Sequence, residues 1–141
     1  MFNTRCIYVR IWANKMIIRN VVSHCEVTLN AEMPFTTNRI LIGDMLSAAK
    51  TLQKGITCLY PSISFFQMFI PPKYLVLMHP KEMTDGGLSS VEIKAYRELA
   101  SFSSPNNELV FSNIYEQRDD LSDNDVLASM KSAFKKNHTI K

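Results

Sequence analysis

The most constraining feature of this 141-residue sequence is the run KYLVLMH at residues 73–79, which Pro80 follows directly. A nearly continuous apolar run of this length is typical of a strand buried on both faces. Proline lacks the N–H group that a continuing sheet ladder needs, so we expect the strand to end there. The run therefore predicts a central strand in a sheet that is covered on both sides.

The residues after this run predict a helix and then a second strand. Ser89 and Glu92 form a capping-box pattern in front of a helix over 90–102, with Val91 among its buried residues. Residues 108–112 have the character of another strand. A strand, a helix and a strand in this order form a βαβ unit, so the two strands should be parallel.

The N-terminal part of the chain predicts antiparallel strands instead. Residues 6–12 and 15–22 alternate side chains between two faces, and the link at 13–14 contains asparagine. Two such runs joined by a two-residue link are typical of a β-hairpin. A third strand is expected over 25–29, so the sheet should be mixed.

One more short strand and two helices complete the expected elements. Residues 39–42 are predicted as a short apolar strand. Asp44 is a suitable N-cap for a helix that runs through Lys54, and Gly55 would close that helix just past its C-cap. A last amphipathic helix is expected over 123–135.

These elements predict a single domain over residues 1–141. Its core would span about 5–115, and 116–141 would form an acidic linker and the C-terminal amphipathic helix. The acidic residues match no calcium-loop spacing, and acidic side chains at a helix start complement the helix dipole. Adjacent His24, Cys25 and Glu26 cannot converge from one strand. We therefore predict no metal site and no cofactor.

Composition excludes several classes of protein. The chain is 46% hydrophobic and 21% charged, which fits a globular domain, and its net charge of +3 is too small to argue for nucleic-acid binding. Three cysteines in or beside apolar runs suit a reducing cytoplasm. Residues 55–72 are uncharged but contain prolines and polar side chains, so no stable membrane insertion is expected.

Three stretches of the sequence resemble the N-terminal subdomain of MreB-like bacterial actin homologues. They are CIYVRIWANKMIIRNV, RILIGDMLSAAKTL and KYLVLMHPKEMTDGGLSSVEIKAYRELASFSSPNNELVFS, in the family's order and within residues 5–115. The resemblance implies a ribonuclease-H-like, actin-like fold. In that fold an antiparallel hairpin and a third strand continue into parallel strands, and helices pack on the sheet.

The sequence departs from this family at the residues that ATP hydrolysis requires. Actin-like ATPases carry an Asp-x-Gly-Thr pattern in the first hairpin, where the carboxylate organises Mg²⁺ and the glycine admits a phosphate. The corresponding positions here are approximately Tyr8, Arg10 and Ile11. Because neither tyrosine nor arginine can fill those roles, the fold is expected without ATP hydrolysis.

An interaction surface is the main functional expectation. A helix with large apolar side chains all round needs cover on more than one side, so part of such a group would face a protein partner or a second copy. The alternative is that all of these side chains belong to the core. The candidate interaction surface comprises Tyr8, Trp12, Phe65, Phe66, Met68, Phe69 and Ile70.

A polar site is the second possibility. His79 ends the central strand, where sites in α/β proteins gather, and Asp85, Gly86 and Gly87 follow in the next loop. Against this, a lone histidine there is commonly a hydrogen-bonded structural residue, and glycines are ordinary in a turn. We therefore expect a non-catalytic protein-interaction module. A small nucleotide-binding protein or hydrolase that uses His79 and the 85–87 loop is the alternative.

Overall fold

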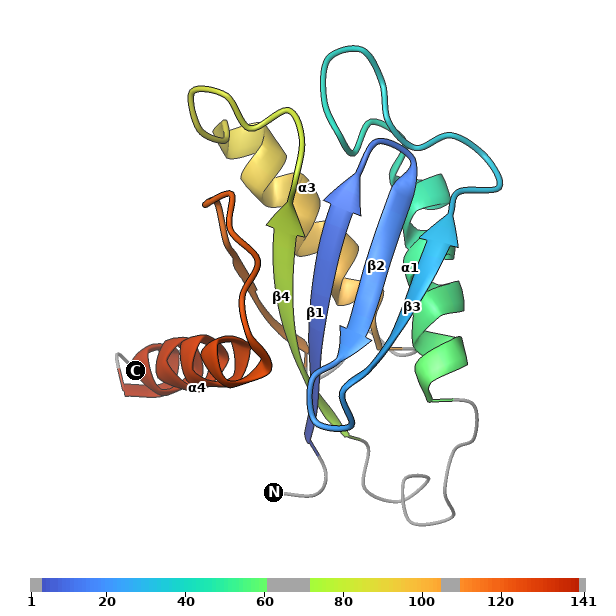
Figure 1. Ribbon diagram of the computed structural model, residues 1–141. Helices are drawn as coiled ribbons and strands as arrows, with labels where there is room; N and C mark the ends of the chain where they lie inside the picture. The colour runs from blue at the N-terminus through green and yellow to red at the C-terminus, as the bar shows by residue number, and fades with distance from the viewer. Residues whose placement is uncertain (1–3, 61–71, 105–109, 140–141) are drawn as a thin grey trace.

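The computed structural model describes residues 4–60, 72–104 and 110–139 (Figure 1). In these residues the protein is an α/β structure with one five-stranded mixed sheet. Its elements are, in chain order, β1 (Thr4–Trp12), β2 (Lys15–Asn20), β3 (Cys25–Asn30), α1 (Met45–Leu59), β4 (Lys73–Pro80), α3 (Ser90–Ser101), β5 (Val110–Ile114) and α4 (Asp123–Thr139).

The strand order across the sheet is β3-β2-β1-β4-β5. β2 pairs antiparallel with both β1 and β3, so the predicted hairpin and third strand are confirmed. β4 pairs parallel with β1 and with β5, which confirms the predicted βαβ unit. β1 and β4 are therefore neighbours inside the sheet. β2 and β3 extend the sheet beyond β1, and β5 extends it beyond β4.

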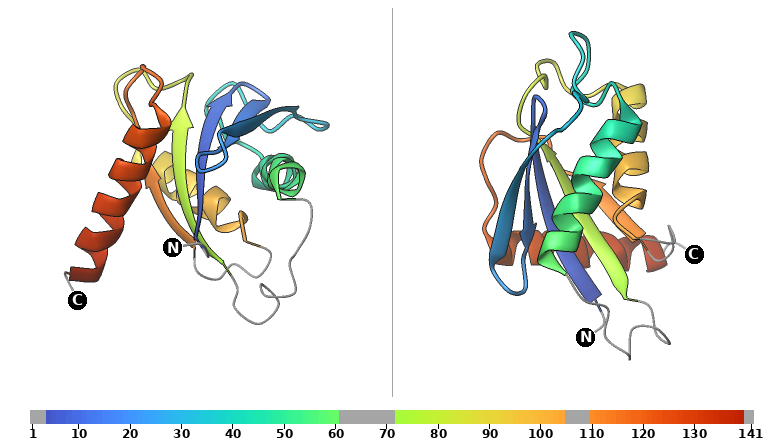
Figure 2. Two further views of the ribbon diagram at one scale, coloured as in Figure 1. Left: turned by 60° about the horizontal axis from the view of Figure 1, so that its bottom comes forward. Right: turned by 90° about the vertical axis from the view of Figure 1, so that its right-hand side faces the viewer.

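Helices cover the sheet on both faces (Figure 2). α1 and α3 lie on one face, where Ile7, Val9 and Ile11 of β1 are fully buried. α4 lies on the other face and packs against β1, β4 and β5. β4 is buried from Tyr74 onward, as expected for a central strand between two layers.

The first helix is longer than the sequence pattern predicts. It continues through Gly55 to Leu59, so the predicted end at Gly55 is wrong. A Cβ atom at Gly55 would lie 2.2 Å from Ile18 Cδ1 and 3.1 Å from Leu29 Cδ2. The absence of a side chain at Gly55 therefore allows α1 to pack closely on β2 and β3. Glycine inside a helix lowers the stability of that helix, and the close packing offsets this loss.

Two smaller predictions also differ from the structure. Residues 39–42 form no strand, because Ile40 and Leu41 accept hydrogen bonds from the chain around Thr36 and Thr37 in a local loop. Val91 is 66% exposed, although the capping box of Ser89 and Glu92 is present as predicted. The buried face of α3 instead consists of Tyr96, Leu99 and Ala100.

Among the described helices, none combines the length and the apolar character that crossing a bilayer requires.

Candidate functional site

His79 lies at the carboxyl end of β4, next to β1. This is the point where the strand order reverses, because β2 and β3 lie on the far side of β1 and β5 lies on the far side of β4. In open α/β sheets this place commonly forms a ligand crevice. Here the segment 115–122, which connects β5 to α4, lies over it. His79 is fully buried, and the ring of Tyr115 meets it edge-on with ring centroids 4.8 Å apart.

Both ring nitrogens of His79 have partners within the chain. Nδ1 lies 2.5 Å from the hydroxyl oxygen of Tyr8, and Nε2 lies 2.7 Å from the main-chain oxygen of Gln117. The Tyr8 hydroxyl also accepts a hydrogen bond from the N–H group of Leu121 at 3.2 Å. This chain of hydrogen bonds therefore joins β1, β4 and the connecting segment.

The partners determine where the protons lie. The carbonyl oxygen of Gln117 can only accept, so Nε2 of His79 carries a proton. The Tyr8 oxygen already accepts from Leu121, and its own hydrogen can be donated to Nδ1. The network thus assigns a neutral His79 with its proton on Nε2.

Burial supports the neutral form of His79. Removal from water lowers the pKa of this imidazole, and the positive charges of Lys81 and Arg10 lower it further. The hydrogen bond to Gln117 and the charge of Asp120 act in the opposite direction. The net direction is downward, so His79 is a structural, uncharged group at neutral pH.

Charged side chains surround this hydrogen-bond chain. Arg10 of β1 contacts Glu26 at 2.9 Å and Asp120 at 3.4 Å, and Lys81 contacts Asp120 at 2.8 Å. Lys81 also donates to the main-chain oxygen of Arg118. The Arg10 and Lys81 side chains are about 15% exposed, but Glu26 and Asp120 are 41% and 54% exposed, so solvent still screens these pairs.

A second cluster fixes the start of α4. Arg19 Nε lies 2.7 Å from Asp123 Oδ1, and Arg19 Nη2 lies 2.9 Å from Asp123 Oδ2. His24 contacts the same carboxylate at 2.5 Å. The Arg19 guanidinium, with help from His24, lowers the pKa of Asp123 to about 2. This bidentate pair therefore attaches α4 to the β2–β3 end of the sheet.

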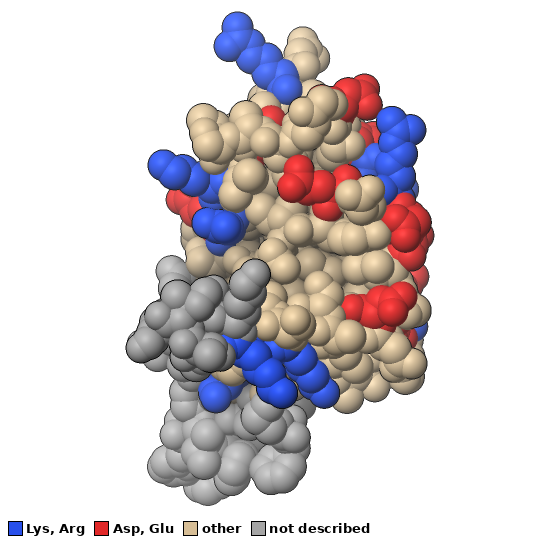
Figure 3. Space-filling model, turned by 90° about the vertical axis from the view of Figure 1, so that its left-hand side faces the viewer, with Lys and Arg blue, Asp and Glu red and all other residues tan. Residues whose placement is uncertain are grey.

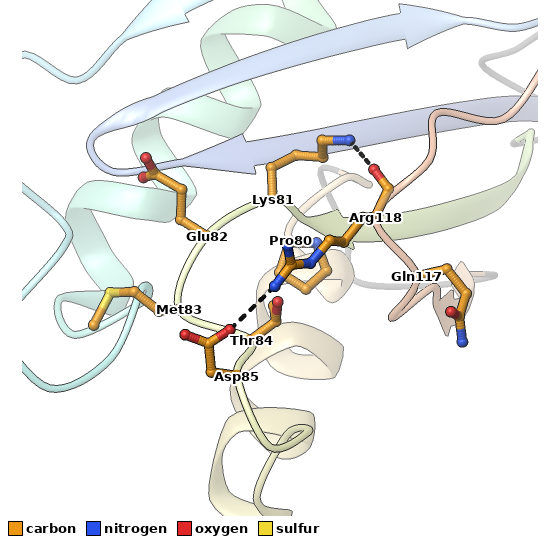
Figure 4. Close-up of a pocket in the computed structure, with 8 residues that line it drawn as sticks. All are labelled: Pro80, Lys81, Glu82, Met83, Thr84, Asp85, Gln117 and Arg118. Carbon is orange, nitrogen blue, oxygen red and sulfur yellow. Dashed lines mark hydrogen bonds and ion pairs between the residues drawn. The ribbon is translucent and has the colours of Figure 1, made fainter.

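Of the predicted loop, Asp85 lines a pocket of about 290 Å³, whereas Gly86 and Gly87 do not. The residues around this pocket are Pro80, Lys81, Glu82, Met83, Thr84, Asp85, Gln117 and Arg118. In Figure 4 Asp85 and Arg118 point toward one another, at a separation of 3.4 Å. Both side chains are at least 90% exposed. His79 does not line this pocket, so the structure does not unite His79 and the loop in one site.

The loop uses its own polar groups. Gly86 and Gly87 have positive φ angles of 79° and 85°, as a tight turn requires. The N–H group of Gly87 donates to the Thr84 oxygen, and that of Leu88 donates to the Glu116 carboxylate. Amides that are engaged in this way, next to a carboxylate, do not form an anion cradle.

The members of the predicted interaction surface do not share one environment in the structure. Tyr8 is only 1% exposed and bound to His79, so the prediction that it faces a partner is wrong. Trp12 is half-buried, and the Lys15 ammonium lies 4.5 Å from the centre of its ring. The remaining members, Phe65, Phe66, Met68, Phe69 and Ile70, lie outside the described residues.

Other kinds of site receive little support from the described residues. Within them, no three histidine, cysteine or acidic side chains gather as a metal site would require. The side of the molecule in Figure 3 carries small separate groups of basic and acidic residues around an uncharged centre. On this side of the molecule, that distribution differs from the basic stripe of a nucleic-acid interface.

Comparison with known proteins gives one relative. The chain is 32% identical over 126 residues to the uncharacterized protein YjaA of Escherichia coli K12, which covers 89% of this chain and 96% of YjaA. The chain belongs to the YjaA family. No family model matches the chain, and no solved structure matches it.

The residues that sequence reasoning missed in this YjaA-family protein are those of the connecting segment. The acidic stretch is predicted to be a solvated linker, yet Asp120 and Asp123 bind basic side chains of the sheet. A signal was present, because Arg10 and Arg19 alternate with apolar residues on predicted strands. Half-buried arginines need carboxylate partners, and this stretch is rich in them.

We predict that Tyr8→Phe destabilises the protein by about 1–3 kcal/mol, because it leaves His79 Nδ1 and the Leu121 N–H group buried without partners. Tyr115→Phe is the matched control. Its hydroxyl binds the exposed Asp119, so its loss should destabilise the protein clearly less than the loss of the Tyr8 hydroxyl. Urea unfolding of both variants measures the difference, and equal costs would contradict the assigned network.

The lowered pKa of His79 predicts a pH-dependent stability. Between the pKa values of the folded and unfolded chain, the unfolded chain binds more protons. The free energy of unfolding should therefore be highest above about pH 6.5 and decrease as the pH falls below that value. Urea titrations from pH 7.5 to 5.5 should show this decrease in the natural protein and a smaller one in His79→Gln. An undiminished decrease in the variant would contradict the role given to His79.

Proposed function

We propose that this protein is a non-catalytic protein-interaction module with a ribonuclease-H-like fold, similar to one subdomain of MreB-like actin homologues. The strand order β3-β2-β1-β4-β5, in which β2 alone runs opposite to the others, supports this fold. It has the three antiparallel strands continuing into parallel strands that the resemblance implies. A cytoskeletal or cell-shape protein is the partner class that follows from that resemblance.

One observation carries the proposal for function. The part of β1 where an actin-like protein would admit a phosphate is occupied by Tyr8, which is hydrogen-bonded to His79 of β4, and by Arg10. The connecting segment is bonded over them through Gln117 and Leu121. A nucleotide would have to displace this segment and break buried hydrogen bonds, each of which costs about 1–3 kcal/mol when left unmade.

A surface elsewhere on the sheet supports binding of a protein. α4 packs on β1, β4 and β5, so the same face of the sheet is open over β2 and β3 (Figure 1). We call this the open face; strand alternation and pairing register place Trp12, Lys15, Ile17 and Thr28 on it. An aromatic ring, an aliphatic side chain and a neighbouring cation are a combination common in protein interfaces.

The cysteines support a cytoplasmic location for this module. Cys6, Cys25 and Cys58 are all free thiols. Cys25 and Cys58 are exposed, whereas Cys6 is buried, and burial raises the pKa of its thiol to about 11. A buried protonated thiol is unreactive, as expected for a structural cysteine in a reducing compartment.

The test places a photo-crosslinking amino acid at position 12 of the full chain in living cells. Irradiation should give protein adducts at this position and few at position 98, an exposed residue of α3 that serves as the matched control. The same protein should show no change in Tm when ATP or GTP is added with Mg²⁺. Adducts absent from position 12, or a reproducible nucleotide-dependent rise in Tm, would contradict the proposal.

A further inference from the structure

β3 is an edge strand of the sheet. Among the described strands it pairs only with β2, and in Figure 1 it is the outermost strand on the right, with α1 behind it. Most of its residues, Cys25–Asn30, are exposed. An edge strand presents N–H and C=O groups that can pair with another strand.

The pairing register shows which groups face outward. Ala31 N–H donates to Asn14 oxygen at 2.9 Å, which continues the β2–β3 ladder beyond the pair Lys15↔Asn30. Hydrogen-bonded and non-hydrogen-bonded pairs alternate along an antiparallel ladder. The main-chain groups of Glu26, Thr28 and Asn30 therefore point away from β2 and toward the open edge.

β3 lacks the devices that usually protect such an edge. Its sequence, CEVTLN, contains neither lysine nor proline, and its register with β2 is continuous from Cys25 to Asn30 without a bulge. Its one charge belongs to Glu26, whose carboxylate is bound by Arg10 and Arg19. The edge is thus nearly neutral and suited to pairing with another strand.

We propose that β3 pairs antiparallel with β3 of a second copy of this chain, so that two sheets join into one. The two-fold axis would pass between the two Thr28 residues. Glu26 of each copy would then pair with Asn30 of the other, and every outward main-chain group of these three residues would gain a partner. A two-fold axis makes the same strand serve both sides of the interface.

This register is favoured by the side chains that it brings together. Thr28 would lie opposite Thr28, a pair that stabilises antiparallel strands, and Val27 would lie opposite Leu29 on the α1 side. A register centred on Glu26 would place like charges opposite one another. A register centred on Asn30 would carry the pairing beyond the end of the strand, toward Pro34.

The contact is small, so the affinity should be modest. A contact confined to two six-residue strands is expected to bury less than about 1,200 Å² in total, which is the size class of weak and transient interfaces. We therefore expect a dimer with a Kd between about 10 μM and 1 mM. This inference rests on the proposed interaction function, since it names a second copy as one partner of that module.

The first test is sedimentation of the full chain over a range of concentrations. The natural protein should shift from monomer toward dimer, and Thr28→Pro should stay monomeric because it removes an outward N–H group. Proline is tolerated at an edge position whose N–H group faces away from the sheet. Thr28→Val keeps the N–H group and should still dimerise, and circular dichroism checks that each variant folds.

A second test holds even if the proline variant fails to fold. In a chain with Cys25→Ser and Cys58→Ser, Thr28→Cys should form a disulfide-linked dimer under mild oxidation, because directly opposite residues of hydrogen-bonded pairs have Cα atoms about 5.5 Å apart. Glu98→Cys on α3 is the control and should crosslink at least tenfold more slowly. A monomer at about 1 mM, with equal rates for the two cysteine variants, would overturn the proposal.

The two proposals fail in different ways. Adducts at position 12 with another protein, in a chain that stays monomeric, would overturn the dimer alone. A nucleotide-dependent rise in Tm would overturn the non-catalytic function and leave the dimer intact.

Discussion

The hydrogen bond between the Tyr8 hydroxyl and His79 Nδ1 connects the two central strands at the end of the sheet where a ligand would enter. It depends on burial, because the surrounding side chains keep His79 uncharged and able to accept. Through Gln117 and Leu121 the same chain holds the connecting segment against the sheet. α4 begins directly after that segment, so this buried contact and the Arg19–Asp123 pair together determine where the α4 layer begins.

Ion pairs also hold the connecting segment and α4 against the sheet. Asp120 binds Arg10 and Lys81 beside the buried histidine, and Asp123 binds Arg19 at the first turn of α4. Each partly exposed pair contributes little by itself, but linked pairs share geometry and restrain one another. An acidic segment and an arginine-bearing sheet face thus act as one unit. A substitution at either side should loosen the α4 layer before it affects the β1–β4 core.

The elements that local patterns specify were predictable from the sequence. The apolar run of β4, the capping box of α3 and the alternation of β1 and β2 each determine their structure through periods of two or 3.6 residues. The end of α1 was not predictable, because Gly55 is needed for contact with strands distant in sequence. The exposure of Val91 likewise depends on how α3 rotates against the sheet.

The candidate site was predictable only in part. The place of His79 at a strand end marks it as a candidate, yet its role depends on the Tyr8 hydroxyl and the Gln117 carbonyl oxygen, which no local pattern connects. The sequence places Tyr8 on an outer surface, because strand alternation does not distinguish a solvent-facing residue from one that a later segment of the chain covers. Membership of the YjaA family adds a relative that is itself uncharacterized, so the physical argument carries the proposed function.

The central claim is that His79 is a neutral structural residue whose Nε2 carries the proton. Nitrogen-15 NMR of the imidazole at neutral pH tests this claim directly, because the two ring nitrogens have distinct chemical shifts when only one is protonated. We predict a protonated Nε2, hydrogen-bonded to Gln117, and an unprotonated Nδ1 that accepts from Tyr8. A charged imidazolium, or a proton on Nδ1, would contradict the account.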